Sequence, residues 1–348
     1  MNQRQANIEM LRIISMFFIV VGHSLCHSVI AGKVFPHQSF VHLSIQYLSI
    51  LTSTAVNCYI LISGYFLVTS KRIKYGKLIG LWLQVFFYSA FFYIQHLFMD
   101  TSSVFSFKAL FKVSMPIMFN MQNNCYWFVA QYFGLYVIHP FLNKMLLSLT
   151  KTQHKELLFI LTVMFCLYGN VFYSQRGFSL SWFIYLYILA AYMRSYGISL
   201  LSKYSNIKLY FLLPIIPLVW GLFVNIGNLP LAGHYDNIYC LSMSLVLFQA
   251  FVNIRLFSDM TKKIILRVSP FVLGVYLIHD NCFVREILWK SLDFWVESPW
   301  IIPILLFYSS VILFFSVIID CLRKYMFAYL CVDRLSVIIE KIFAKCIK

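Results

Sequence analysis

The sequence predicts an all-α protein, a polytopic membrane helix bundle with about ten transmembrane spans and both termini in the cytoplasm. Of its 348 residues, 61% are hydrophobic and only 11% are charged, whereas charged residues make up about 25% of a typical soluble domain. Apolar runs of roughly 17 to 25 residues, long enough to cross a bilayer as helices, recur along the chain. Lysine and arginine gather in alternate connections between these runs. These observations exclude a soluble globular protein.

The apolar runs, each bounded by charged or turn residues, define the elements in order. The first run is longer than the apolar part of a signal peptide and reaches no Ala-x-Ala-like site, so we expect it to be retained as a helix. The fifth and sixth runs are short, and the segment 108–121 is expected along the membrane interface, so nine or eleven spans are the alternatives. The ten predicted spans are 8–30, 41–69, 78–98, 125–147, 157–173, 179–193, 209–226, 238–254, 268–289 and 300–321.

The distribution of lysine and arginine orients the predicted bundle. With a cytoplasmic N-terminus, about 22 of the 28 lysines and arginines fall in cytoplasmic segments and about 6 outside. The formal net charge of +16 is therefore an orientation and inner-leaflet signal, and we expect no nucleic-acid partner. We expect a multi-pass protein of the cell (plasma) membrane.

The chain divides into two predicted parts. Residues 1–322 form the transmembrane domain, with no internal repeat and no hydrophilic stretch long enough for a second folded domain. Residues 323–348 alternate basic and apolar side chains, which predicts an amphipathic cytoplasmic tail on the anionic membrane lipids of the inner leaflet. The sequence does not indicate an oligomeric state.

The first predicted span carries four ionisable side chains: Glu9, Arg12, His23 and His27. The eleven residues from Arg12 to His23 bring the two side chains to within roughly 20° of each other, about 16 Å apart along the helix axis. Because ionisable groups facing lipid cost several kcal/mol, this face should point into the bundle or a wet cavity. Glu9 and Arg12 are spaced for an i,i+3 ion pair.

Each of these residues has an alternative interpretation. Glu9 and Arg12 could instead anchor the end of the helix at the lipid headgroups, and His23 could instead form a single hydrogen bond between two helices. Against this, histidine is the side chain most often used to take a proton from a hydroxyl nucleophile near neutral pH. His23 and His27 supply only two metal ligands, and no acidic or thiolate partner is evident, so we expect no metal.

Four stretches carry a family resemblance. The first, "IEMLRIISMFFIVVGHS" (8–24), has an acid, an arginine three residues later and a histidine eleven beyond that. It is followed by "CYILISGYFLV" (58–68), by "NCYWFVAQYFGLYVIHPFLN" (124–143) and by "SPFVLGVYLIHDN" (269–281), with its Tyr-Leu-x-His phrase. In this order they resemble the acyltransferase-3 family of integral-membrane acyltransferases, and the resemblance spans almost the whole chain.

The resemblance implies transfer of an acyl group, usually acetyl, from cytoplasmic acyl-CoA to a hydroxyl of a surface or exported polysaccharide or its lipid-linked precursor. Acetyl-CoA would be the donor, and 1–322 would be the acyltransferase domain. His23 would be the catalytic residue, either activating the acceptor hydroxyl or carrying the acyl group. Arg12 and Glu9 would assist from the same face, toward the donor's phosphates or the charge balance of the cavity.

The other site residues are implied in the same way, and each has an alternative. Ser63 and Tyr65 either line the site or lie where two helices approach each other closely. Tyr126 and Trp127 either stack against a sugar or belong to the aromatic belt at the membrane interface. His279, beside Asp280, fits a second polar cluster or a buried structural pair. In the connection that would bind the donor, the family is often rich in arginine, whereas this chain has mostly lysines. Lysine can bind a phosphate but lacks the two-pronged hydrogen bonding of arginine. The alternative is that these lysines only reflect the ordinary excess of positive charge on the cytoplasmic side. The implied substrate-binding residues are Ser63, Tyr65, Tyr126, Trp127, Tyr276 and His279, and the implied donor-binding residues are Lys71, Arg72 and Lys74.

Three other functions compete. A transporter or flippase of a glycan or lipid-linked precursor also has about ten spans and inward-facing ionisable residues, but inverted repeats and paired broken spans are not evident. A glycerolipid-type acyltransferase would need a histidine followed five residues later by an aspartate, and none of the nine histidines has one. A binding-only protein descended from an enzyme is the third, and His23 with Arg12 argues against it.

Overall fold

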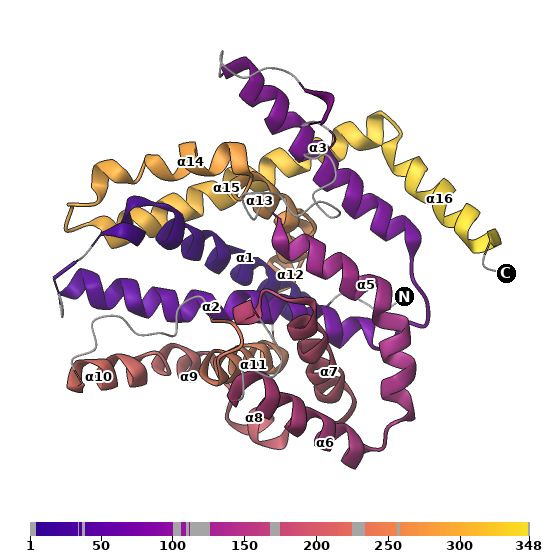
Figure 1. The fold of residues 1–348 in the computed structure, drawn as a ribbon, viewed down its shortest axis with the longest axis horizontal. Coiled ribbons are helices and arrows are strands. Elements are labelled where there is room, and N and C mark those ends of the chain that lie inside the picture. The colour runs from indigo at the N-terminus through magenta and orange to yellow at the C-terminus, as the bar shows by residue number, and fades with distance from the viewer. Residues whose placement is uncertain are drawn as a thin grey trace.

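The computed structural model describes residues 5–33, 35–36, 39–99, 106–108, 111, 126–167, 175–224, 234–255 and 258–346. Within these ranges the chain is helical and contains no strand (Figure 1). The helices are α1 (Ala6–His27), α2 (Phe40–Leu67), α3 (Tyr75–Met99), α5 (Trp127–Ser148), α6 (Lys151–Thr162), α7 (Leu180–Tyr196), α8 (Ser199–Tyr204), α9 (Ile207–Leu212), α10 (Ile215–Phe223), α11 (Ile238–Asn253), α12 (Asp259–Val268), α13 (Val272–His279), α14 (Cys282–Lys290), α15 (Ile301–Tyr329) and α16 (Val332–Cys346).

Four of the described helices, α1, α2, α3 and α15, are long and apolar enough to cross a membrane. They begin and end within a few residues of four predicted spans, except that α15 continues to Tyr329. Three more predicted spans correspond to α5, α7 and α11. Helix α6 with the π-helical turn Val163–Leu167 covers part of the span at 157–173. Residues 109–110, 112–121, 125, 168–173 and 225–226 of the predicted segments lie outside the described residues.

Two predicted spans are interrupted within their length. The span at 209–226 breaks at Pro214 into α9 and α10, because proline has no N–H to continue the helical ladder. The span at 268–289 breaks at Asp280 and Asn281 into α13 and α14. The Asn281 side chain accepts a hydrogen bond from the backbone N–H of Phe283 and so starts a new helix as an N-cap.

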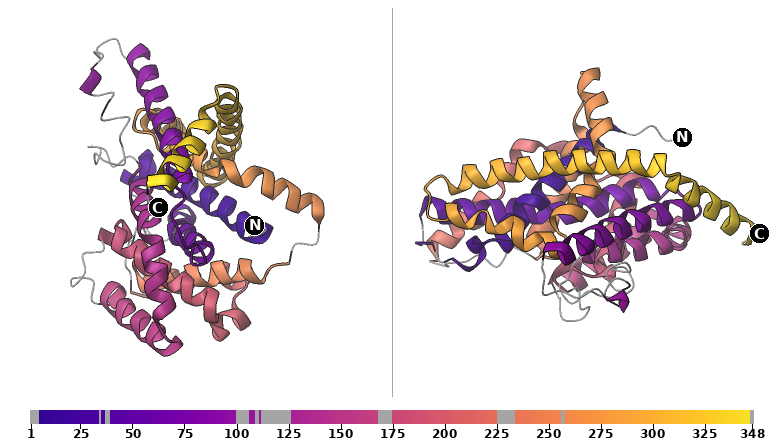
Figure 2. Two further views of the ribbon diagram at one scale, coloured as in Figure 1. Left: turned by 90° about the vertical axis from the view of Figure 1, so that its right-hand side faces the viewer. Right: turned by 90° about the horizontal axis from the view of Figure 1, so that it is seen from above.

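Helices α1 and α2 lie side by side at the centre of the bundle (Figure 1). On one side α1 packs against α13 and α15, and on the other side α2 packs against α7 and α11. Each side has its own cluster of buried apolar side chains. In Figure 2, α15 spans the bundle and α16 bends away from its end to pack against α3. The central pair therefore has protein on both faces, and this is where polar groups can be held away from lipid.

A buried carboxylate ties α3 to α15. Asp320 is fully buried and accepts hydrogen bonds from Gln84, Tyr88 and Arg323 at 2.6 to 3.0 Å. A Cβ added to Gly274 of α13 would lie 2.2 Å from Cγ of Asp320. Glycine at position 274 therefore lets α13 approach this network, which fixes three helices together.

Candidate active site

His23 lies in a cavity of about 400 Å³ between α1, α2 and α5, which we call the histidine cavity. Its walls include Tyr59 from α2, Trp127 from α5 and Tyr276 from α13. The His23 side chain is 18% exposed, so the imidazole is reachable from the cavity although it lies inside the bundle. The predicted residues His23, Trp127 and Tyr276 thus meet in one place.

The hydrogen bonds behind His23 determine where its protons are. Nδ1 of His279 lies 2.6 Å from the carbonyl oxygen of Val275, and a carbonyl can only accept, so Nδ1 of His279 carries the proton. In the neutral ring, Nε2 of His279 is then an acceptor. Nδ1 of His23 lies 3.0 Å from that nitrogen and must be the donor. The neutral His23 ring therefore has an unprotonated Nε2, the nitrogen required of a base or nucleophile.

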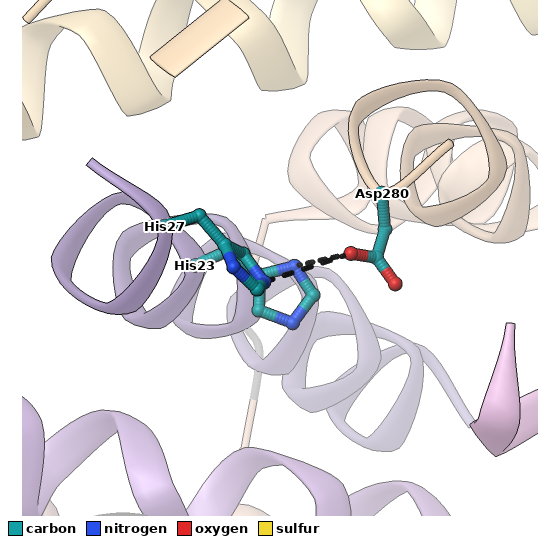
Figure 3. A group of neighbouring side chains, drawn as sticks. All are labelled: His23, His27 and Asp280. Carbon is teal, nitrogen blue, oxygen red and sulfur yellow. Dashed lines mark ion pairs between the residues drawn. The ribbon is translucent and has the colours of Figure 1, made fainter. Parts of the chain in front are cut away.

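Asp280 supplies a carboxylate to the same histidine. Its Oδ1 lies 3.5 Å from Nδ1 of His23 and 3.9 Å from Nε2 of His27, and both rings turn toward it in Figure 3. Arg285 of α14 holds the carboxylate in place, with Nη2 3.0 Å from Oδ1 and 3.2 Å from the Asp280 carbonyl oxygen. A carboxylate beside Nδ1–H stabilises the imidazolium that forms when Nε2 takes a proton.

Asp280 is the acidic group that a metal site at His23 and His27 would need, and its position beside them was not evident from the sequence. Nδ1 of His23, Nε2 of His27 and Oδ1 of Asp280 lie within 4.8 Å of one another. However, Nδ1 of His23 already faces His279, and the positive charge of Arg285 faces Oδ1. This arrangement matches a histidine oriented for proton transfer better than a set of free metal ligands.

Arg12 and Glu9 lie away from the histidine cavity. Nη1 of Arg12 is 2.6 Å from Oε2 of Glu9, which confirms the expected i,i+3 ion pair. Arg12 and Ser63 line a second cavity of about 300 Å³, the arginine cavity. The Tyr59 hydroxyl donates to the Arg12 carbonyl oxygen at 3.0 Å, and Tyr59 lines the histidine cavity. Arg12 therefore lines a different cavity from His23.

A third cavity, the basic cavity, has a volume of about 1010 Å³ and begins where α2 ends. Lys71 and Arg72 line it, together with Lys144 of α5 and Arg194 of α7. Lys74 lies in the same connection but outside the described lining. Residues of α2 between 42 and 59 line the histidine cavity and residues between 62 and 67 line the arginine cavity, whereas residues 68–73, directly after the helix, line the basic cavity. The three cavities thus follow one another along α2 and the start of the α2–α3 connection.

Aromatic rings form part of the wall of the histidine cavity. Trp127 and Tyr235 are stacked with ring centroids 6.2 Å apart, and Phe178 packs against both. Buried Asn57 fixes this wall, because its amide donates to the Tyr235 carbonyl oxygen and accepts from the indole of Trp182. Burial raises the pKa of the Tyr235 phenol, so this group stays neutral. Flat rings of this kind can stack against a sugar.

The remaining predicted residues lie elsewhere. Tyr126 is buried and donates to the carbonyl oxygen of Leu277 at 2.5 Å, and Asn281 donates to its hydroxyl. It therefore braces the break between α13 and α14. His279 is fully buried behind His23. Tyr65 lies under Arg194, whose guanidinium carbon is 4.7 Å from the ring centroid, and so contacts a residue that lines the basic cavity. Neighbouring Gly64 allows close helix packing, since its Cβ would lie 2.8 Å from Ala190.

The sequence interpretation missed several residues that shape the site. In the sequence, Arg285 is only one of the positive charges predicted on the outer side, although in the structure it holds Asp280. The sequence pattern predicts no site role for Tyr59, Asn57 or Tyr235. Asn57 could have been found, because it is an amide at the centre of an apolar run, where polar side chains need a partner. Tyr235 carries no comparable signal.

A comparison with protein families identifies the family of the chain. Residues 5–321 match a family described as an acyltransferase domain. No curated protein and no solved structure matches the chain. The match covers nearly the whole helical bundle, including both histidines of the hydrogen-bonded pair, and leaves out α16. The chain therefore belongs to the acyltransferase-3 family, a family of membrane acyltransferases.

Proposed function

We propose that this protein is an O-acyltransferase of the plasma membrane, which moves an acetyl group from cytoplasmic acetyl-CoA to a hydroxyl of a cell-surface or exported polysaccharide or its lipid-linked precursor. With about ten spans and both termini in the cytoplasm, the basic cavity would lie at the inner face and the histidine cavity toward the outer half of the membrane. This topology follows from the lysine and arginine distribution.

The observation that carries the proposal is the hydrogen-bonded pair of His23 and His279. It holds His23 as a neutral ring with Nε2 unprotonated, at the wall of a cavity large enough for a sugar. Nε2 takes the proton of the acceptor hydroxyl as its oxygen attacks the thioester carbonyl. The carbon–sulfur bond then breaks, and the imidazolium returns the proton to the leaving thiolate. Asp280 stabilises the imidazolium between these steps.

A covalent route is the second form of the same chemistry. Nε2 would attack the thioester carbonyl and release the thiolate, and the acceptor hydroxyl would then take the acyl group from the histidine. Both routes use the same tautomer of His23 and need no metal. They differ in whether the acyl group can be trapped on His23 without an acceptor.

The order of the three cavities supports a donor that binds at the inner face of the membrane and an acceptor that binds toward the outer face. Four cationic side chains line the basic cavity, where the phosphates of the donor would bind. The arginine cavity lies between it and His23, on the path that the pantetheine arm would take. The stacked rings of Trp127 and Tyr235 provide a platform for the acceptor sugar.

The test is a proton NMR count of ester-linked acyl groups on the surface polysaccharides of cells lacking the protein. The cells are complemented with wild type, with His23→Ala or with His42→Ala at matched expression. His42 also lines the histidine cavity and is the matched control. We expect wild type and His42→Ala to restore the ester signal and His23→Ala not to restore it.

Restoration by His23→Ala would refute the catalytic role of His23. Loss of polysaccharide export instead of loss of ester would favour a transporter or flippase. Purified protein in nanodiscs with radiolabelled acetyl-CoA and no acceptor then separates the two chemical routes, because only the covalent route leaves label on the chain.

A further inference from the structure

Helix α16 lies outside the part of the chain that matches the family, which ends at residue 321, yet it contributes to the basic cavity. Glu340 and Phe343 of α16 line this cavity together with residues of α5, α7 and the α2–α3 connection. The cavity is therefore incomplete without the tail.

The Glu340 carboxylate fastens α16 to the start of α3. Its Oε2 accepts a hydrogen bond of 2.5 Å from the backbone N–H of Gly76. Gly76 lies in the first turn of α3, where backbone N–H groups have no partner within the helix and a negative charge is favourable. The carboxylate is thus engaged by α3 and does not stand free among the cations of the cavity.

A second contact brings an aromatic pair to the cavity. Phe343 and Tyr75 stack with ring centroids 4.6 Å apart and an angle of 15° between their planes, and both line the cavity. Gly76 makes this approach possible, because a Cβ at position 76 would lie 2.8 Å from the carbonyl oxygen of Ser336 in α16.

The wall formed by α16 differs chemically from the rest of the cavity. The cations Lys71, Arg72, Lys144 and Arg194 come from other elements, whereas α16 brings an aromatic ring and an engaged carboxylate. A ligand that fits both parts has phosphates at one end and a flat, apolar-faced ring beside them. The opposite face of α16 exposes Ile338 and Ile342, which leaves that face for the membrane surface.

We propose that α16 is part of the acyl-donor site, where Phe343 and Tyr75 pack against the adenine base of coenzyme A and Glu340 holds the helix in place. This inference rests on the proposed function, in which the basic cavity takes acyl-CoA. Stacking of a base on an aromatic ring is strong enough to change affinity several-fold or more.

The experiment measures binding of coenzyme A and of 4′-phosphopantetheine, which lacks the nucleotide, to the full-length protein in nanodiscs by isothermal titration calorimetry. The variants are Phe343→Ala, which removes the ring, and Gly76→Leu, which pushes α16 away from α3. Ile338→Ala, on the exposed face of the same helix, is the control. We expect both test variants to raise the Kd for coenzyme A about fivefold or more and to leave the Kd for phosphopantetheine unchanged, and we expect Phe343→Ala to melt near wild type.

Two results would overturn the inference. An unchanged Kd for coenzyme A in both variants would mean that α16 makes no contact with the base. An equal weakening for the two probes would mean that α16 only supports the fold. If wild type binds neither probe, the donor proposal itself fails, and this outcome is distinct from both of the others.

Discussion

Nδ1 of His23 lies 3.0 Å from Nε2 of His279, although the two residues are 256 positions apart in the chain. The contact exists because α13 packs directly against α1. It places a fixed acceptor behind His23, and that acceptor is itself held by the Val275 carbonyl. The orientation and the tautomer of His23 are therefore properties of the packed bundle.

His279 should act as a positioning residue for His23. His279→Leu removes the acceptor, frees the ring to adopt the other tautomer and should lower kcat on the order of 100-fold, with little change in KM for the donor. His279→Gln offers an amide oxygen as acceptor and should retain more activity. The measurement is kcat and KM for both variants, together with the pH profile of kcat. Equal losses in the two variants with an unchanged profile would indicate a structural role alone.

The pair of Asp280 and Arg285 should matter for stability and for activity separately. Asp280→Asn leaves a half-buried guanidinium without its carboxylate, and breaking a buried pair costs about 3 to 5 kcal/mol. Adding Arg285→Met should recover most of the lost stability but none of the lost activity, because the carboxylate beside His23 is still missing. Thermal unfolding in detergent and acyl transfer, measured on the same samples, check this. Recovery of activity by the double variant would contradict the role of Asp280.

Gly274→Ala should destabilise the protein. The new Cβ would lie 2.2 Å from Cγ of Asp320, and overpacking of this kind costs about 1 to 3 kcal/mol. Gly80→Ala is the matched control, because Gly80 is also helical and has no neighbouring atom within 4 Å of its Cβ position. Melting temperatures in detergent should fall for Gly274→Ala and stay level or rise for Gly80→Ala. A fall of equal size in both would rule out the close approach at Asp320 as the cause.

Trp127 should determine affinity for the acceptor. Trp127→Ala removes the ring stacked on Tyr235 and should raise KM for the acceptor glycan about tenfold, while KM for acetyl-CoA stays the same. Trp127→Phe keeps a flat ring and should lose less. The measurement is steady-state transfer with each substrate varied in turn. A change confined to the donor KM would remove Trp127 from the acceptor platform.

His154 should make the protein less stable in mild acid. It is buried near the start of α6, and its ring is 3.1 Å from the Ile188 carbonyl oxygen. Burial lowers its pKa below the usual 6.5. The unfolded chain therefore binds a proton first as the pH falls, and the contribution of His154 to stability is complete above about pH 6.5 and declines below it. His154→Gln should flatten the dependence of melting temperature on pH between 7 and 5; an identical slope in wild type and variant would contradict this.

Local patterns allowed the long elements and the local ion pair to be predicted. Charged and turn residues mark the ends of α1, α2 and α3, and the Arg12–Glu9 pair follows from i,i+3 spacing alone. The match to the acyltransferase family confirms the resemblance drawn from the four stretches.

Features that depend on packing between distant segments could not be predicted. The span predicted at 268–289 contains Asp280 and Asn281, and its division at these two residues was not predicted, because an asparagine N-cap is hard to distinguish from a buried amide in sequence. The contact of Asp280 with His23 and His27 requires knowing which helices are neighbours. The catalytic, acceptor and donor roles assigned to individual residues remain predictions.

Tyr59 stands between the histidine cavity and the arginine cavity, with its hydroxyl on the Arg12 carbonyl oxygen. If the donor arm follows the path proposed above, it has to pass this phenol to reach His23. The hydrogen bond that holds Tyr59 in place would then have to yield as the donor enters, so that the route between the two sides of the bilayer is narrow whenever no donor is bound.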